Sequence, residues 1–449
     1  MTYLAKRLVP NRFIQFKKVG AAGLAALLAL LVGCSAIGGT LLPTVEVPVE
    51  VSAPATETLT PTAVATEITP ASTSSPPIPE VDLAAEIPPA PDLLAVPRLD
   101  TSVASVPLSE ILFDTFGRTL ARFVSLDQAK EELILGLRDA IAPVYHPVYG
   151  GAGDLPWLED ANLVIGYVAG DRAYAYPINI LNLHELVNDE LAGVPVLISY
   201  CPLCASGVVY SRKLDEQTLL FGNTSALYQS DLVMFDHQTG SYWFQTGGEA
   251  VVGSLTGKRL ELLPSVTMAW GEWKRLYPET GLLTGTAGSP AQFAGSRYAR
   301  EIFSGYAERV NDNKFAFPVN EENLDDRLPA GEVVLTAEVG KSVTAYPLGP
   351  LGNAAVNDRV GQQPVVVFIR KDNRAAGVFS PIVDSQTLTF DYEEERDGFF
   401  DRETGSQWDA AGRSIVGPLK GAQLRRLESR RAFWFSLVIA FPQVRLYSP

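Results

Sequence analysis

The sequence predicts a mainly β protein with a few helices (α+β), whose folded part consists of two tandem β-rich halves related by internal duplication. Three observations support this prediction: apolar residues alternate with a period of two beyond Ala161, turn residues are frequent, and a series of motifs recurs in the same order. A chain of 48.5 kDa with 47% hydrophobic residues is long enough for two or three separate cores. The pattern does not distinguish a sandwich from a barrel.

The first 34 residues resemble an export signal. The apolar run from Ala21 to Val32 is too short to span a bilayer comfortably and follows a basic region containing Lys6, Arg7, Arg12, Lys17 and Lys18. The run ends in Leu31-Val32-Gly33-Cys34, a pattern similar to bacterial lipoprotein processing sites. We expect a lipidated Cys34 that anchors the protein to a membrane at the extracytoplasmic face of the cell envelope. An ordinary signal peptide or membrane anchor with an incidental Cys34 is the alternative.

A linker is expected over residues 35–104, where Pro, Thr, Ala, Ser and Glu predominate and Arg98 is the only Lys or Arg. This composition buries too little apolar surface to offset the conformational entropy of the chain. We therefore expect a disordered tether between the membrane and the folded part.

The folded part begins near Ser105 in this interpretation. Ser125-Leu126-Asp127-Gln128 forms a capping-box pattern, and an amphipathic helix is predicted to follow it as far as Pro143, with Leu126, Ala129, Leu133, Leu137 and Ile141 on its apolar face. Beyond this helix we expect strands around 164–168, 173–176, 194–198, 207–210, 219–221, 232–235 and 241–244.

Recurring motifs define the two halves. Four motifs recur in the same order, at offsets that fall from 170 to 164 residues. The pairs are Tyr176-Pro177 with Tyr346-Pro347, Val187-Asn188-Asp189 with Val356-Asn357-Asp358, Asp236-x-x-Thr239-Gly240-Ser241-x-Trp243 with Asp401-x-x-Thr404-Gly405-Ser406-x-Trp408, and Trp270 with Trp434. A slowly drifting offset is typical of a duplication with small deletions. We expect a first copy at 105–278, a connecting segment at 279–331 and a second copy at 332–449.

The two copies differ in their sulfur and imidazole groups. Cys201, Cys204, His184 and His237 are matched in the second copy by Arg370, Asn373, Asn353 and Arg402, respectively. Residues shared by both copies are expected to determine the fold, whereas residues special to one copy are better functional candidates. The first copy is therefore predicted to be the active one.

Cys201 and Cys204 form a Cys-x-x-Cys motif after an apolar strand. Such a turn lets two sulfurs bind one tetrahedral ion, and Cys-Pro-Leu-Cys resembles a knuckle of rubredoxin or of a zinc ribbon. Ala205 occupies a position where such knuckles usually have Gly, and no second Cys pair exists. His184 and His237 are then the candidate remaining ligands, and thiolate with imidazole suits Zn, Cu or Fe.

Two alternatives remain open for the same pair. Cys201 and Cys204 could cycle between dithiol and disulfide in a cell-surface oxidoreductase, although the residues from Ala205 to Tyr210 predict a strand where thioredoxin-like proteins have a helix. They could also form a permanent structural disulfide, which would leave a non-catalytic binding or scaffold module in the envelope.

Glu185 follows His184 in a short helical or turn segment and is matched by Ala354 in the second copy. We expect Glu185 to serve as a general base or to support a metal ligand. His237 is the weaker ligand candidate because its counterpart Arg402 indicates only a need for a polar side chain. The formal net charge of −15 disfavours binding to nucleic acid.

Several of these motifs together resemble the domain-of-unknown-function family numbered 3179, a group of exported bacterial and archaeal proteins. The resemblance covers roughly 105–445 and is carried by His-Glu-x-Val-Asn-Asp at 184–189, Tyr-Cys-Pro-Leu-Cys at 200–204, Phe221-Gly222, Ser230-Asp231-Leu232, Asp236-x-x-Thr-Gly-Ser-x-Trp243 and Trp270-Gly271-Glu272-Trp273. It implies that Cys201, Cys204 and His184 are signature residues. His237 stands where the family pattern has Arg, and no activity is implied.

Overall fold

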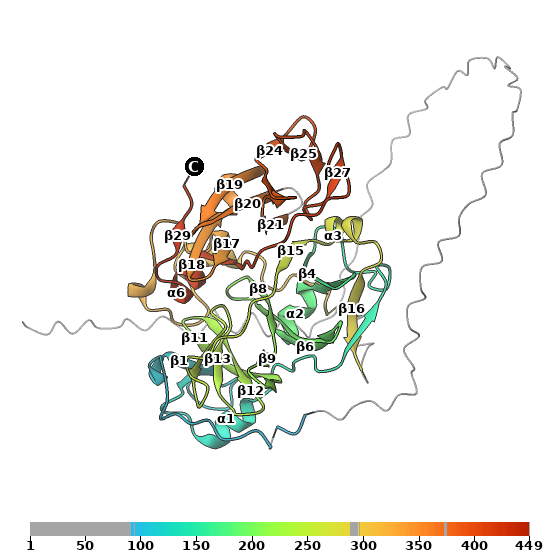
Figure 1. Cartoon of the computed structure of the whole chain (residues 1–449). Coiled ribbons are helices and arrows are strands. Elements are labelled where there is room, and N and C mark those ends of the chain that lie inside the picture. The colour runs from blue at the N-terminus through green and yellow to red at the C-terminus, as the bar shows by residue number, and fades with distance from the viewer. Residues whose placement is uncertain (1–90, 94, 288–294, 296, 372–374, 449) are drawn as a thin grey trace, which may run out of the picture. The chain divides into compact units, whose positions relative to one another are not determined.

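A computed structural model describes residues 91–93, 95–287, 295, 297–371 and 375–448 (Figure 1). The predicted export signal, the lipidated Cys34 and most of the predicted tether lie outside the described residues. Within them the protein is mostly β, as predicted, with several sheets and short helices. No helix in this part of the chain is both long and apolar enough to cross a membrane.

The first half begins with a six-stranded sheet in the order β14-β13-β12-β11-β1-β2. Its strands are β1 (Ile111–Asp114), β2 (Phe123–Ser125), β11 (Phe221–Tyr228), β12 (Asp231–Asp236), β13 (Tyr242–Phe244) and β14 (Glu249–Val252). β11 and β12 form a hairpin with a bulge between Asn223 and Ala226. This hairpin contacts β6 (Leu186–Leu191), which pairs with β7 (Val194–Cys201), the strand that ends at Cys201.

A five-stranded sheet in the order β15-β4-β5-β16-β3 combines four strands of the first half with β16 from the connecting segment. Its strands are β3 (Pro147–Gly150), β4 (Leu163–Ala169), β5 (Arg172–Pro177), β15 (Ser265–Ala269) and β16 (Gly281–Thr286). β4 and β5 cover two of the predicted strand regions and form a hairpin, and Gly170 at its turn has φ +61°, which glycine adopts without strain. Helix α2 (Ile178–His184) follows β5 directly.

A seven-stranded sheet joins the two predicted halves. Its order is β29-β18-β17-β28-β8-β7-β6, with β7 (Val194–Cys201), β8 (Ser206–Ser211), β17 (Val333–Val339), β18 (Ser342–Pro347), β28 (Arg431–Phe433) and β29 (Arg445–Leu446). β28 pairs with β8 at Arg431 and Gly207. The halves therefore share one sheet. No sheet among the described residues closes into a barrel, which answers part of the question that the sequence left open.

The second half completes the molecule with smaller sheets. Three strands, β19 (Ala354–Val360), β20 (Gln363–Arg370) and β21 (Ala375–Phe379), form one sheet, and β24 (Phe390–Glu393), β25 (Gly398–Asp401), β26 (Gln407–Trp408) and β27 (Ser414–Val416) form another. A short hairpin of β22 (Ile382–Val383) and β23 (Gln386–Thr387) also belongs to the second half, and the first half has a similar hairpin of β9 (Lys213–Leu214) and β10 (Gln217–Thr218). The remaining helices are α1 (Glu131–Leu137), α3 (Trp270–Leu276), α4 (Tyr306–Asn311), α5 (Leu348–Leu351) and α6 (Trp434–Ala440), with 3₁₀ turns at Leu108–Glu110 and Glu321–Asn323.

The recurring motifs make the same hydrogen bonds in both halves. Asn188 exchanges two bonds with the backbone of Phe221, and Asn357 does the same with Phe390. Asp236 accepts bonds from Thr239 and from the Trp243 indole, and this arrangement recurs at Asp401, Thr404 and Trp408. These residues fix turns and strand positions, as predicted for residues that both halves share.

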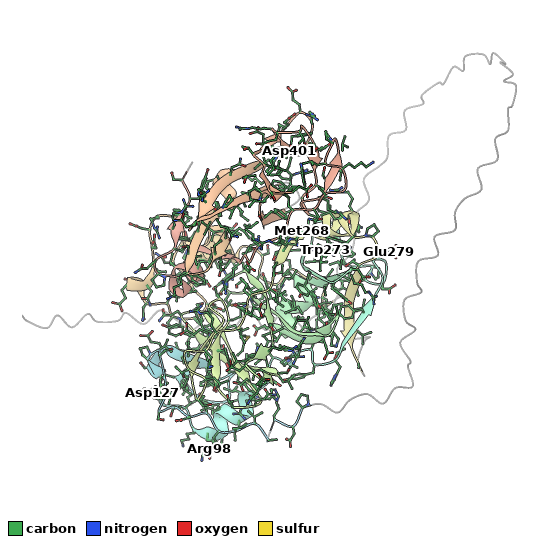
Figure 2. All side chains as sticks on the ribbon, viewed as in Figure 1. Arg98, Asp127, Met268, Trp273, Glu279 and Asp401 are labelled. Carbon is green, nitrogen blue, oxygen red and sulfur yellow. The ribbon has the colours of Figure 1, made fainter. Side chains whose placement is uncertain are left out.

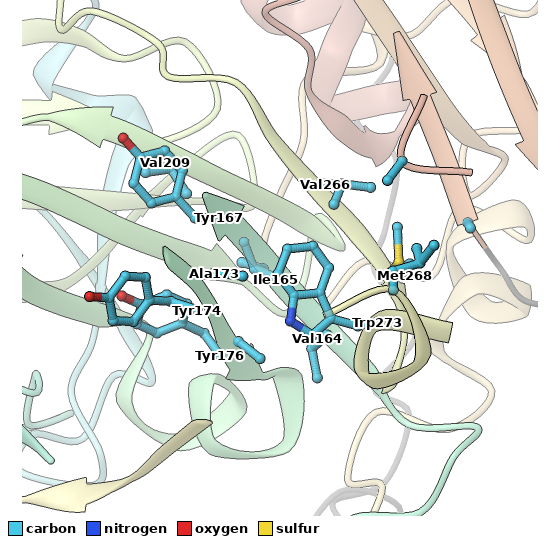
Figure 3. Packing of buried hydrophobic residues seen from close by; sticks show 14 of the residues in the cluster. Val164, Ile165, Tyr167, Ala173, Tyr174, Tyr176, Val209, Val266, Met268 and Trp273 are labelled. Carbon is cyan, nitrogen blue, oxygen red and sulfur yellow. The ribbon is translucent and has the colours of Figure 1, made fainter. Parts of the chain in front are cut away.

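The largest core surrounds Trp273, whose indole lies against Val164 and Ile165 of β4 (Figure 3). A Cβ atom at Gly166 would overlap the Trp273 ring, so this strand position requires glycine. Met268 and Trp273 are fully buried in the interior, whereas Glu279 is exposed near its edge (Figure 2).

Two sequence expectations need correction. Helix α1 begins at Glu131, because Phe123–Ser125 pairs with β1 as a strand and the capping-box residues form a turn. Packed structure begins before Ser105: Val96 is buried, and the Arg138 guanidinium donates to the carbonyl oxygens of Val96 and Pro97. Because a buried guanidinium needs hydrogen-bond acceptors, Arg138 fixes residues 96 and 97, near the C-terminal end of the expected tether, to the folded part.

Candidate metal centre

The Cys–Pro–Leu–Cys turn connects β7 to β8. Cys201 ends β7, the backbone N–H of Cys204 donates to the Cys201 carbonyl at 3.2 Å, and β8 begins at Ser206. Ala205 adopts φ +47°, the left-handed conformation that explains why knuckles of this kind usually have glycine there. The Phe433 N–H donates to the Cys204 carbonyl at 2.7 Å. The second half thus holds the turn that carries the thiols.

Both cysteines are buried, with 1% and 0% of Cys201 and Cys204 exposed, and their sulfur atoms are not bonded to each other in this structure. Their sulfur atoms lie 3.1 Å apart, and the Cys204 thiol also donates to the Ser230 carbonyl at 3.4 Å. Burial raises the pKa of both thiols, and the charge of nearby Asp231 raises each further. The free thiols are therefore poor nucleophiles unless a cation or a proton acceptor compensates for the burial.

Asp231 lies beside this pair, at the start of β12. The turn before it consists of Gln229 and Ser230, which have φ +51° and +64°, although hairpin turns of this kind favour Asn-Gly. The Ser436 hydroxyl donates to Asp231 Oδ2 at 2.9 Å, whereas Oδ1 is buried and has no hydrogen-bond partner among the described residues. Burial raises the pKa of Asp231 to about 6, against the lowering effect of neighbouring hydroxyls and thiols.

Cys201, Cys204 and Asp231 together form a candidate metal centre. One ligand atom from each residue lies within 4.8 Å of the other two, and all three residues are buried. Two thiols and one carboxylate are a donor set that transition metals such as zinc accept, and three protein ligands leave a coordination position open. The arrangement can thus hold a metal ion.

Asp231 was not predicted as a ligand from the sequence, although Ser230-Asp231-Leu232 carries part of the family resemblance. The offset of 165 that relates Asp236 to Asp401 places Arg396 opposite Asp231. A search for carboxylates that occur in only one half, in addition to sulfur and imidazole groups, would have identified Asp231.

Glu185 is close to this centre. It ends α2 with φ +58°, its carboxylate accepts a hydrogen bond from the Asn223 amide, and its backbone carbonyl accepts one from Tyr200. Burial raises the pKa of Glu185 to about 7, and the charge of Asp231 contributes to the increase. A carboxyl group with this pKa can accept or release a proton near neutral pH, as a general base must. The role of Glu185 as a general base stays a prediction.

His184 contacts other groups. Its Nδ1 lies 2.8 Å from the Ala142 carbonyl oxygen and its Nε2 lies 3.1 Å from the Tyr298 hydroxyl, and the imidazole stacks on the Tyr298 ring. The group formed by Cys201, Cys204 and Asp231 does not include His184. In this structure His184 holds the segment around Tyr298 against α2, and metal binding by His184 stays a prediction.

His237 belongs to a separate hydrogen-bonded network. Its Nε2 lies 3.1 Å from the Tyr145 hydroxyl, which donates to Asp139 Oδ2 at 2.5 Å, and its ring stacks on Phe235. Burial and the charge of Arg138 lower the pKa of His237 to about 4. The structure therefore does not bring His237 into the group around the cysteines.

The model of the family described as "Protein of unknown function (DUF3179)" matches residues 138–444, about two thirds of the chain. No curated protein and no solved structure matches. The match confirms the resemblance carried by the Cys–Pro–Leu–Cys turn and its neighbouring motifs, and the chain belongs to the DUF3179 family of unknown function.

Proposed function

We propose that this protein is a membrane-anchored lipoprotein of the cell envelope that holds a transition-metal ion through Cys201, Cys204 and Asp231. The observation that carries the proposal is the convergence of two thiols and a carboxylate, from two different turns, inside the protein. The buried Asp231 Oδ1, without a partner among the described residues, supports it further. A buried acceptor of this kind costs about 1–3 kcal/mol if it binds nothing.

Electrostatics also favour a bound cation. Three acidic groups share this buried site, and burial raises the pKa of each of them. A divalent cation offsets the free-energy cost of ionising these buried groups, because it stabilises thiolate and carboxylate directly. Zinc, copper or iron fits thiolate-rich ligation. Glu185 would act on a molecule bound at the open position, or would support the site by exchanging a proton.

Metal analysis of the full-length protein tests this proposal. Protein purified without chelators under anaerobic conditions is expected to contain a single transition-metal ion per chain, whereas Cys201→Ser and Asp231→Asn should lose most of it. His184→Gln is the matched control, because both ring nitrogens of His184 have partners elsewhere. Metal loss in His184→Gln would instead support ligation by His184. A folded wild-type protein that contains no metal and rebinds none rejects the metal centre.

A thiol-disulfide oxidoreductase is the second candidate, and the sulfur–sulfur distance of 3.1 Å favours it. A modest rotation of both side chains would form a bond of about 2.05 Å. That step removes two electrons and two protons from Cys201 and Cys204 and reduces an external disulfide. Thiol titration across redox buffers distinguishes the two candidates: reversible oxidation at the potential of the compartment supports this one, and a very low potential indicates a structural disulfide. A protein with neither property would act as a binding or scaffold module.

The anchoring part of the proposal depends on residues 1–104. The basic region, the short apolar run and Cys34 support export and lipidation, and the composition of the linker supports a flexible tether. Partition into detergent that is lost in Cys34→Ser is the expected behaviour of a lipoprotein.

We also infer that the halves at 105–278 and 332–449 arose by duplication. The equal hydrogen bonds of Asn188 and Asn357, and of Asp236 and Asp401, support this history. So does the pairing of β4 with β5 and of β17 with β18, in which Val164 faces Pro177 and Val334 faces Pro347.

A further inference from the structure

The three proposed ligands all belong to the first half, but one segment of the second half contacts both turns that supply them. The Phe433 N–H, at the end of β28, donates to the Cys204 carbonyl at 2.7 Å. Three residues later, in α6, the Ser436 hydroxyl donates to Asp231 Oδ2 at 2.9 Å. Helix α6 therefore lies beside the β11–β12 hairpin (Figure 1). The segment 433–436 thus joins the Cys–Pro–Leu–Cys turn to Asp231.

Ser436 belongs to a chain of hydroxyl groups inside the protein. Its Oγ lies 2.9 Å from Thr246 Oγ1, which in turn lies 3.0 Å from Ser206 Oγ. Ser206 begins β8, two residues after Cys204, and all three hydroxyl residues are fully buried. The chain therefore holds the Ser436 side chain in a fixed position relative to both Asp231 and β8.

An equivalent segment of the first half lies against the second half. Strand β15 contacts β21, as β28 pairs with β8, and the offset of 169 makes β21 the counterpart of β8. β15 and β28 each lead directly into a helix that begins with a tryptophan, Trp270 of α3 or Trp434 of α6. The offset of 164 between these tryptophans makes Glu272 the counterpart of Ser436. Each half therefore covers the other with the same strand and helix.

The side chain at this helix position differs between the halves, as the ligands do. The second half contains no cysteine, and Arg370 replaces Cys201 there. On α3, Glu272 forms an ion pair with Arg275. Ser436 of α6 instead supplies a neutral hydroxyl, where a carboxylate would add a further negative charge to the three acidic groups of the candidate metal centre. A neutral donor thus stands at this position only beside the thiols.

A carboxylate that binds a metal is usually oriented by a hydrogen bond to its other oxygen. Ser436 binds Oδ2 of Asp231 and leaves Oδ1, which has no hydrogen-bond partner among the described residues, for the ion. We propose that Ser436 is a positioning residue of the candidate metal centre, which holds Asp231 in place as the third ligand. The second half thereby completes a site whose ligands all belong to the first half.

This role of Ser436 rests on the proposed function, because Asp231 is one of the proposed ligands. The test measures the affinity of the full-length protein in detergent for Zn²⁺ alone, by competition with a chelator after anaerobic removal of metal. Ser436→Ala should weaken binding by about 10–100-fold, the usual effect of losing the hydrogen-bond partner of a ligand. Ser436→Thr keeps the hydroxyl and should retain the affinity.

Two comparisons separate positioning from a general effect on folding. Ser406→Ala is the matched control, because it removes a fully buried hydroxyl of the second half that bonds only Thr404 and the Leu419 N–H among the described residues, and it should leave the affinity unchanged. If Ser436 acts through Asp231, Ser436→Ala should weaken binding little further once Asp231→Asn is present. In protein loaded with Co²⁺, Ser436→Ala should shift the visible spectrum in the direction of Asp231→Asn, and Ser406→Ala should not.

Thermal unfolding establishes that each variant is folded. If Ser436→Ala does not fold, Thr246→Val takes its place under the same criteria, because it removes the other hydroxyl bonded to Ser436 and should also weaken binding. A folded wild-type protein that binds no Zn²⁺ rejects the metal centre and the role of Ser436 together. If the wild type binds Zn²⁺ but folded Ser436→Ala binds it as tightly, or if the losses caused by Ser436→Ala and Asp231→Asn add, only the positioning role is overturned.

Discussion

Two titrating groups of one network should make opposite contributions to the pH dependence of stability. Tyr145 connects them: its hydroxyl donates to Asp139 Oδ2 at 2.5 Å and lies 3.1 Å from His237 Nε2. Burial raises the pKa of Asp139 from 3.8 to about 6, although hydrogen bonds and the Arg138 charge oppose the increase. Burial and the same Arg138 charge lower the pKa of His237 from 6.5 to about 4.

The signs follow from proton linkage. Folded Asp139 binds its proton more tightly than the unfolded chain does, so its contribution to stability is full below pH 3.8 and is lost as the pH rises through about 6. Folded His237 binds its proton less tightly, so its contribution is present above pH 6.5 and is lost as the pH falls through about 4. Each shift of about two units is equivalent to roughly 3 kcal/mol, and partial solvent exposure reduces this to about 1–2 kcal/mol.

Single substitutions separate the two contributions. Relative to the wild type, Asp139→Asn should lose stability as the pH falls from 6.5 to 4, because only the His237 contribution remains. His237→Gln, which keeps a hydrogen-bonding group near Tyr145, should gain stability over the same interval. Guanidinium unfolding followed by tryptophan fluorescence at several pH values measures both curves. If the stability of both variants, relative to the wild type, changed in the same direction over this pH interval, the opposite pKa shifts assigned to Asp139 and His237 would be refuted.

Three further substitutions test the fold and the anchor. Gly166→Ala should lower stability by about 1–3 kcal/mol, measured by chemical unfolding, because its methyl group would overlap the Trp273 ring. Arg430→Met should cost about 3–5 kcal/mol of stability, because it leaves Glu338 without its partner in a largely buried ion pair. The double variant Arg430→Met with Glu338→Leu should recover much of this stability, and a double variant as unstable as Arg430→Met would contradict the reasoning. Cys34→Ser should move the protein from the membrane fraction to the soluble fraction, and unchanged membrane association would point to an uncleaved anchor.

Local patterns in the sequence predicted most strands, because alternation and turn residues act over a few positions. The hairpin of β4 and β5 and the strand after Cys204 follow from such patterns. The shared seven-stranded sheet did not follow, because its central contact joins Gly207 to Arg431, more than 200 residues apart. Pairing over such a distance leaves no local signal.

The residues of the candidate site were also predicted only in part from the sequence. Cys201 and Cys204 were predicted, since two sulfurs three residues apart are recognisable in any sequence. Asp231 was not selected, because its proximity to them depends on the position of the β11–β12 hairpin beside β7 and β8. His184 is near Cys201 in sequence, yet its ring contacts Tyr298, which lies in the segment between the halves.

Backbone strain at Ala205 offers a last test of the turn that carries the thiols. Its φ of +47° costs an L residue about 1–2 kcal/mol, whereas glycine adopts this conformation without strain and loses about 0.5–1 kcal/mol through the entropy of the unfolded chain. Ala205→Gly should therefore stabilise the protein by about 0.5–1 kcal/mol, measured by chemical unfolding, with metal content unchanged. If Ala205→Gly instead destabilised the protein, the turn would not have the knuckle geometry on which the proposed ligation by Cys201 and Cys204 depends.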